Sequence, residues 1–511
     1  MVTNGLFQAG ISVYIWSMPG FIRKVPTRSG ATAVQIVYKR GREVVSINHI
    51  GSAHNKFELD ILVSRAKEIK DAAQRKLDLF EYKEREVYLE SSYSGLLWEV
   101  LSRAYQLLGF DSIKDEIFQQ LVLARIIEPT SKLDSIRVLK GLGLDAPSNT
   151  SIHRCLKRIN DNDYRSAISN KCFEHAVPDA LTLVLYDVTT LYFEIQKEDA
   201  YRKPGLSKER RLEPQITIGL LVDKTGFPLE VTSFEGNKAE VKTLVPVLQA
   251  FKSRHNLTSI TVTADSAMLS SGNLSELEEM GYTYIVGSRI SKCPYEIEEY
   301  IKLPGAELKD EQIFESKMKA TIAGKRTDRR VIYQYRQKRA KIDLLNIDKL
   351  LDKAQRMVQG TLNTKSNRFL KIISEKKEIN TALVESARQR AGIKGYVTNL
   401  DIPALQVIDY YHQLFQVEKS FRIAKSDLKA RPIFHHKRES IDAHLTIVFA
   451  SLAVARYIEA LTNISIQRFV RTLVPIRTGV ISVNGTTMPL KPRLPQHLAA
   501  LVNSLGKFGG Y

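Results

Sequence analysis

Five short apolar runs between residues 181 and 287 constrain the fold more than any other feature of the sequence. Each has the length of a strand and is rich in Val, Ile, Leu or Thr, and helical patterns separate the last three. Runs of this kind are typical of strands buried in a sheet. They are LTLVLYD (181–187), QITIGLLVD (215–223), PLEVTSFEG (228–236), SITVTAD (259–265) and YTYIVG (282–287). Strands that alternate with helices in this order predict an α/β fold with a mixed sheet flanked by helices.

Two of the runs end in a carboxylate, Asp187 and Asp265. Open α/β sheets bind ligands at the carboxyl ends of their strands, so these two acids are candidates for a shared site. Taken singly, each acid is more often a solvated residue at the end of a strand. A functional site at Asp187 and Asp265 is therefore indicated only if a third functional group lies with them.

A third acid occurs in the segment YHQLFQVEKSFRIAK (411–425), which has neither Pro nor Gly and predicts part of a helix over 405–426. On one continuous helix its notable residues share one stripe: Tyr411, Leu414, Glu418, Lys425 and, one turn after Glu418, Arg422. A carboxylate beside an aromatic hydroxyl and two cations suits a site for a metal ion and a phosphodiester. An ordinary amphipathic helix with a Glu418–Arg422 pair explains the same pattern equally well.

The net charge of +19 favours a polyanionic partner. Nucleic acid is a better candidate than an anionic membrane surface, because the sequence has no transmembrane-length apolar run after its N-terminus and no basic leader. Its three cysteines are scattered and odd in number, which argues against a disulfide framework or a zinc cluster. We therefore expect a cytoplasmic protein, associated with the nucleoid and not with a membrane.

Residues 96–175 show helical patterns throughout. The last part, IHRCLKRIN, carries three cations, Arg154, Lys157 and Arg158, and follows a shorter helix and a turn. Two short helices with a basic second helix resemble a helix-turn-helix, so this region is the candidate DNA reader. A plain helical bundle shows the same pattern.

Three carboxylates on one α/β sheet suit phosphodiester chemistry, which needs an activated hydroxyl or water and a stabilised leaving oxygen. Two Mg²⁺ or Mn²⁺ ions held by Asp187, Asp265 and Glu418 would meet both needs through oxygen ligands. Competing chemistries lack their residues, because the sequence has no P-loop, GxSxG, HExxH or paired CxxC motif.

These motifs resemble the DDE transposases of bacterial insertion sequences, in the group with the signature Y-x2-R-x3-E-x6-K. The signature positions here are Tyr411, Leu414, Glu418 and Lys425, with Leu414 in place of the arginine. Four further stretches look like motifs of that group: LYDVTTLYFE around Asp187, TADSAML around Asp265, RSGATAVQ (28–35) and EPTSKLDS (128–135). The resemblance covers nearly all of residues 20–470.

The resemblance implies an RNase H-like core in which Asp187, Asp265 and Glu418 form the metal-binding triad. It also implies that Tyr411 and Lys425 contact phosphates of the transposon end. Leu414 leaves the family's arginine contact unassigned, and Arg422 and Lys419 are the two candidates to supply it.

The patterns along the sequence also divide the chain. A predicted hairpin (33–39 and 43–49) and helix (58–77) form its N-terminal module. Seven regions are expected: an extension (1–20), an N-terminal α+β module (21–95), a helical DNA-binding region (96–178), the first part of the catalytic core (179–290), an insertion domain (291–394), the second part of the core (395–470) and a C-terminal tail (471–511).

The function that follows is cut-and-paste transposition. The protein would bind terminal inverted repeats of double-stranded DNA, pair two ends as a homodimer, cleave them and join the freed 3′-hydroxyl to target DNA. The family suggests that second-strand cleavage passes through a hairpin. Two alternatives are a DNA-binding regulator descended from such an enzyme, against which the three retained acids argue, and a metal-dependent nuclease that joins no strands.

Overall fold

The structure is a computed structural model. It describes residues 20–78, 87–176, 183–194, 197–205, 213–266, 270–322, 325–362, 366–373, 376–483 and 486–506. The extension expected over residues 1–20 lies, apart from Gly20, outside the described residues. The chain divides into two compact units, one made of residues 1–90 and 480–489 and the other of 91–479 and 490–511.

The first unit contains an antiparallel sheet of order β1-β2-β3. Its elements are β1 (Gly20–Pro26), β2 (Thr32–Arg40), β3 (Glu43–Ala53) and α2 (Lys56–Asp78). Helix α2 packs on this sheet, where Val34, Ile36, Tyr38 and Ala66 form a small core. The predicted hairpin and helix are confirmed. Gly41 makes the hairpin turn with φ of 63°, a conformation that glycine adopts without strain.

The second unit begins with helices, as the sequence predicts. They are α3 (Gly95–Leu107), η1 (Phe110–Ile113), α4 (Glu116–Ile127), α5 (Ser135–Lys140), α6 (Asn149–Asp161) and α7 (Tyr164–Ala176). Asp115 caps α4 by accepting a hydrogen bond from the backbone N–H of Phe118 at 3.1 Å. Buried faces of these helices join the main hydrophobic core of the protein.

A mixed eight-stranded sheet forms the centre of the second unit, with the order β10-β11-β14-β9-β8-β5-β6-β7. The strands are β5 (Leu183–Tyr192), β6 (Gln215–Asp223), β7 (Pro228–Glu235), β8 (Thr261–Ala264), β9 (Thr283–Ser288), β10 (Ile313–Ile322), β11 (Lys325–Tyr335) and β14 (Ile393–Thr398). Strands β5, β8 and β9 are parallel, and the remaining neighbours pair antiparallel. The predicted α/β class with a large mixed sheet is confirmed.

The connections of the sheet include η3 (Glu240–Lys242), α8 (Leu244–His255), α9 (Ser271–Glu279) and α10 (Tyr295–Lys302). The segment expected as an insertion contributes β10 and β11 to the sheet itself. It continues with α11 (Gln337–Val358), β12 (Leu370–Ile373), β13 (Lys376–Ile379) and α12 (Thr381–Gln389). Ile347, Ala354, Phe369, Val384 and Ala387 give this later part a small core of its own.

The position of Asp187 in its strand differs from the prediction. Strand β5 does not end at Asp187 but continues to Tyr192, which pairs with Gln215 of β6. Residues 188–192 are mostly β-branched or aromatic, and pairing with β6 extends the strand past the charged residue. The prediction for Asp265 is confirmed, because it directly follows the last residue of β8.

The single helix predicted over 405–426 is wrong. The chain forms α13 (Ala404–His412), α14 (Phe415–Arg422) and a π-helical turn, η5 (Ile423–Asp427). Tertiary packing overrides the helical periodicity. The Tyr411 ring packs against Tyr396, with 4.9 Å between the ring centroids, in a small cluster under α13. Val417 of α14 is instead buried in the main core. The two helices thus serve different packing surfaces, and the stripe from Tyr411 to Lys425 is interrupted.

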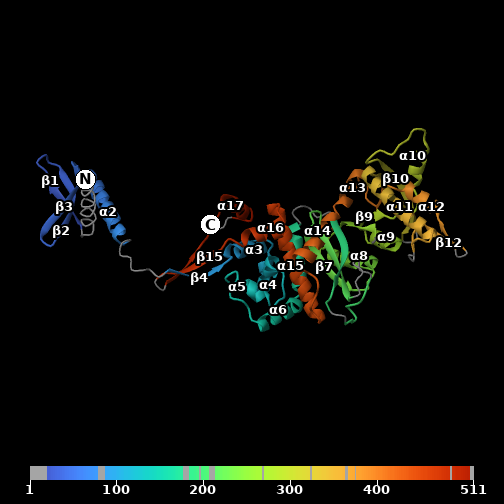
Figure 1. The fold of residues 1–511 in the computed structure, drawn as a ribbon, viewed down its shortest axis with the longest axis horizontal. Coiled ribbons are helices and arrows are strands. Elements are labelled where there is room, and N and C mark those ends of the chain that lie inside the picture. Colours follow the sequence, from blue (N-terminus) through green and yellow to red (C-terminus); the bar gives the residue numbers. More distant parts are fainter. Residues whose placement is uncertain are drawn as a thin grey trace. The chain divides into compact units, whose positions relative to one another are not determined.

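The long helix α15 (Arg438–Thr462) is the central support of the second unit. It packs on α4 and α6 on one side and on β7 on the other, as Figure 1 shows. By length and apolar composition it is a candidate membrane span, but most of it is buried inside the protein. Burial on several sides explains why the helix is apolar all round.

The chain ends with α16 (Ile466–Leu473), β15 (Thr478–Val483), β16 (Thr486–Leu490) and α17 (Gln496–Asn503). Strand β4 (Val87–Tyr93) joins β15 and β16 in a three-stranded sheet of order β16-β15-β4. The boundary between the two units runs through these strands.

Candidate functional site

Asp187, Asp265 and Glu418 line one cavity of about 250 Å³. They come from β5, from the residue after β8 and from α14, so the fold gathers three acids that are distant in the sequence. Asp187 is partly buried, whereas Asp265 and Glu418 are exposed. The cavity unites the predicted triad, although the catalytic role of each acid stays a prediction.

Strand pairing places the two aspartates. Tyr186 of β5 lies opposite Ala264 of β8 in the parallel pair, so Asp187 and Asp265 follow at the same level on neighbouring strands. The apolar residues that precede them are buried, which anchors both backbones in the core. This arrangement brings both carboxyl groups to one place although Asp187 does not end its strand.

Packing of α14 places the glutamate. Val417 and Phe421 are buried against the main core, and Glu418, which follows Val417, therefore stays exposed toward the cavity. Glu418 lies in the first turn of α14, where the positive end of the helix dipole favours a carboxylate.

Tyr411 contacts the site directly. Its hydroxyl donates a hydrogen bond to Oδ1 of Asp265 at 3.2 Å, and the same oxygen accepts the backbone N–H of Ser266 at 2.6 Å. Burial, reinforced by Asp265, raises the pKa of the Tyr411 phenol well above its usual range. The phenol is therefore a protonated donor that orients Asp265. A Cβ at Gly287 would lie 2.6 Å from the Tyr411 hydroxyl oxygen, so only glycine fits beside it.

Lys394 is a site residue that sequence reasoning missed. Its Nζ lies 4.3 Å from the Tyr411 ring centroid, and its side chain lines the acid cavity. Burial and nearby Arg339 lower the pKa of Lys394, while Asp265 and Glu418 act in the opposite direction. The only sequence signal is a lysine inside the apolar strand IKGYVT.

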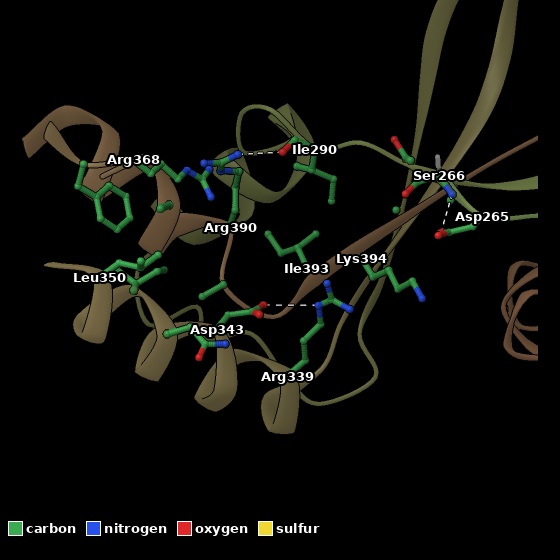
Figure 2. A pocket seen from close by; sticks show the side chains of 18 of the residues that line it. Asp265, Ser266, Ile290, Arg339, Asp343, Leu350, Arg368, Arg390, Ile393 and Lys394 are labelled. Carbon is green, nitrogen blue, oxygen red and sulfur yellow. Dashed lines mark hydrogen bonds and ion pairs between the residues drawn. The ribbon is translucent and has the colours of Figure 1, made fainter. Parts of the chain in front are cut away.

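A larger cavity of about 520 Å³ adjoins the acid cavity and shares Asp265, Lys394 and Tyr411 with it. Figure 2 shows Lys394 and Asp265 at one end and Arg368 with Arg390 at the other. Arg390 donates to the carbonyl oxygen of Ile290 at 2.8 Å. Sequence reasoning missed these arginines too, because they come from separate helices and loops.

The other cations predicted near Glu418 have different surroundings. Lys425 lines a small apolar cavity with Thr189 and Leu191 and does not line the acid cavity. Lys419 pairs with Glu459 of α15 at 3.3 Å, and Arg422 is exposed on α14. Leu414, which replaces the signature arginine, does line the acid cavity. Among the described residues, Lys394 is the lysine that lines the acid cavity, and Lys425 does not.

The predicted DNA-reading residues on α6 also separate into two groups. Arg154 and Lys157 are exposed. Arg158 is bound to Asp115, the N-cap of α4, with 2.8 Å between Nη2 and Oδ2. Arg158 therefore joins two helices of the fold, which leaves Arg154 and Lys157 as the exposed cations of the predicted set.

The acid cavity offers carboxylate oxygens, which are ligands that Mg²⁺ accepts. The described part of the chain holds no group of three or more His, Cys, Asp or Glu side chains close enough for one ion. Mg²⁺ usually takes only one or two carboxylates and completes its coordination with water and substrate phosphates. Separate carboxylates around an open cavity meet that requirement.

A comparison with models of protein families identifies the family of this chain. A family model described as a transposase DDE domain matches residues 179–454, which include all eight strands of the central sheet and α14. One similar solved structure is a cryo-EM structure of a piggyBac transposase synaptic complex with hairpin DNA. The two chains are 12% identical, the match covers 75% of this chain and 69% of that chain, and the TM-score is 0.35. No curated protein matches this chain.

Proposed function

The chain belongs to the family of transposase DDE domains, whose model matches more than half of its length, and we propose that it is a cut-and-paste transposase of an insertion sequence. It binds the terminal inverted repeats of its element, cleaves the DNA there and joins the freed 3′-hydroxyl to target DNA. It acts in the cytoplasm, on the nucleoid, as a homodimer assembled on two ends.

The observation that carries the proposal is the acid cavity. Three carboxylates from distant parts of an α/β sheet line about 250 Å³ of space together with Lys394. Asp187, Asp265 and Glu418 would hold Mg²⁺ or Mn²⁺, with two ions as the proposed number. Such ions lower the pKa of bound water and stabilise the leaving oxygen of a phosphodiester. The sheet around them then corresponds to an RNase H-like core.

The surrounding side chains orient the carboxylates and bind the phosphates of the DNA strand. The Tyr411 hydroxyl holds Oδ1 of Asp265 in one orientation. Lys394 presents a cation beside the acids, where it offsets the charge of a scissile phosphate. Arg339 and Arg390 line the adjoining cavity and extend the cationic surface along which the strand lies.

Recognition of the ends is assigned to a different part of the second unit. Arg154 and Lys157 are exposed on α6, in the region that resembles a helix-turn-helix. Phosphate contacts by such cations fix the register of the protein on the duplex. Arg422 extends the contact from the side of α14.

The test uses the full chain, a labelled duplex from the inverted repeats that flank the gene, supercoiled target DNA and Mg²⁺. We expect cleavage at the repeat end and labelled product joined to the target. Cleavage without joining would identify a nuclease, and binding without cleavage would identify a regulator. Chelation of the metal is the control that separates this activity from a contaminating metal-independent nuclease.

A further inference from the structure

A separate cavity of about 510 Å³ shares no lining residue with the acid cavity. Its walls come from the α4–α5 connection, α6, residues 429–435 and His444 of α15. The ionisable residues that line it are Arg125, Lys132, Lys429, Arg431 and three histidines. Among the described residues, no aspartate or glutamate lines this cavity.

The motif EPTSKLDS (128–135), which has no role in the catalytic proposal, builds one wall. Its two acids, Glu128 and Asp134, both bind Arg137, at 3.2 and 2.9 Å. Thr130 donates to Asp134 at 2.7 Å, which closes the loop. The acids of the motif are thus engaged by Arg137, while Lys132 lines the cavity.

Lys132 is held by two imidazoles. Its Nζ lies 2.9 Å from Nδ1 of His444 and 2.6 Å from Nε2 of His435. His444 Nε2 lies 3.0 Å from the carbonyl oxygen of Ala430, which can only accept a hydrogen bond. In neutral His444 the proton is therefore on Nε2, and Nδ1 accepts from Lys132.

The imidazoles position the lysine but do not neutralise it. Burial lowers the pKa of both histidines, that of His435 to about 3, so both rings are neutral near pH 7. Burial and neighbouring Arg125 also lower the pKa of Lys132, which reflects the cost of placing a cation there. A bound anion would favour the protonated form of Lys132. The ammonium group then has three N–H donors, of which the two rings take two.

Arg125 adds a second cation to this cavity, and its hydrogen bonds go to backbone carbonyl oxygens. It is buried, and its Nη1 donates to the carbonyl oxygens of Leu428 at 2.8 Å and Lys429 at 3.2 Å. Its Nη2 lies 3.4 Å from the carbonyl oxygen of Thr130. Buried cations are normally paired with an anion, and no anionic side chain of the described chain lines this cavity.

We propose that the cavity binds a phosphate group, with the third N–H of Lys132 as donor and Arg125 as the neighbouring charge. Ile152 and Leu156 of α6 form an apolar wall that can cover the attached sugar. Arg154 and Lys157 are exposed on the same helix. Because of these neighbours, we take the bound phosphate group to belong to a DNA strand. Only this identification of the phosphate rests on the proposed function.

The first test needs no DNA. Thermal unfolding of the full chain is measured in inorganic phosphate and in chloride at equal ionic strength. We expect phosphate to raise the melting temperature of the wild type and of Lys132→Arg, but not of Lys132→Gln. The matched control is Lys302→Gln, which removes an exposed lysine paired with Glu299 on α10 and should respond like the wild type.

If Lys132→Gln fails to fold, Lys429→Gln replaces it, because Lys429 is exposed and lines the same cavity. We expect Lys429→Gln to reduce the phosphate response. An equal response of the wild type and the cavity variants would overturn the proposal.

The second test identifies the source of the phosphate. Binding to an inverted-repeat duplex is measured against salt concentration, and Lys132→Gln should lower the log–log slope by about one unit. A lost phosphate response with an unchanged DNA slope would assign the site to free phosphate. A wild type that binds no DNA would contradict the proposed function and leave the phosphate test intact. Unchanged behaviour of Lys132→Gln in both tests would exclude the site.

Discussion

The acid cavity and the cavity around Lys132 differ in how their charges are balanced. Three carboxylates and Lys394 meet in the first, so charges of both signs offset each other within the protein. Of the residues that the structure describes, only cations and histidines supply ionisable groups to the second. The carboxylates of the acid cavity can therefore bind metal cations in exchange for the Lys394 ammonium group. The cavity around Lys132 can instead bind an anion.

The largest expected effect tests the first half of this comparison. Asp187→Asn, Asp265→Asn and Glu418→Gln should each lower end cleavage by at least about 10²–10³-fold, the typical loss when one preorganised catalytic group is removed. DNA binding should remain close to wild type, because each substitution removes negative charge. The measurement is single-turnover cleavage of a labelled end, with binding assayed in parallel. Retained Mg²⁺-dependent cleavage in one variant would remove that residue from the triad.

A smaller effect is expected at Lys394, whose side chain lines the acid cavity. Lys394→Met should slow cleavage by about tenfold, because it removes one charge-assisted contact to a phosphate. The same change should lower the Mg²⁺ concentration needed for half-maximal cleavage, since a competing cation is gone. Lys394→Arg keeps the charge and serves as the control. A higher Mg²⁺ requirement in Lys394→Met would contradict the idea that lysine and metal share the same carboxylates.

A pH measurement tests the second half of the comparison. Burial lowers the pKa of His435 from 6.5 to about 3 and moves that of His444 in the same direction. Between these values the unfolded chain binds more protons than the folded chain, so stability falls as pH drops from 6.5 toward 3. We expect the melting temperature to decrease by several degrees between pH 7 and pH 5.

His435→Gln is the matched variant for this pH effect, because it keeps a hydrogen-bonding group but cannot titrate. Its melting temperature should depend less on pH than that of the wild type over the same range. An identical pH dependence would show that other groups, such as His255 with a pKa lowered to about 4 by burial, account for the loss.

Much of the sheet could be predicted from the sequence because continuous apolar runs such as residues 215–223 permit few alternatives. The sequence predicts the end of β5 too early, because the charged Asp187 ends the apolar pattern but does not end the pairing with β6. The helical periodicity after residue 404 predicts one long helix, but the first helix ends at His412. Local pattern could not report that Tyr411 and Val417 pack on different surfaces.

The candidate site can be predicted from the sequence only in part, because local patterns do not report tertiary contacts. Asp187, Asp265 and Glu418 have a recognisable sequence context, and the structure brings them to one cavity. Lys394 has no such context, because a single lysine in a strand forms no pattern. The motif around Lys132 is recognisable in the sequence, but the partners of Lys132, His435 and His444, are 303 and 312 residues away, so only the fold reveals the cavity.

The smallest effect is expected at Tyr411, and it separates two kinds of chemistry. Tyr411→Phe removes one hydrogen bond to Asp265 but keeps the ring that packs on Tyr396. A bond of this kind contributes about 1 kcal/mol, so cleavage should slow by only about two- to tenfold. Because burial holds the phenol protonated, Tyr411 should not attack DNA, and denatured reactions of the wild type should contain no protein–DNA adduct. Gel analysis of labelled DNA after protease treatment measures this directly. A phosphotyrosine trapped at Tyr411 would replace the metal-dependent mechanism by a covalent one, and the acid cavity would then need another explanation.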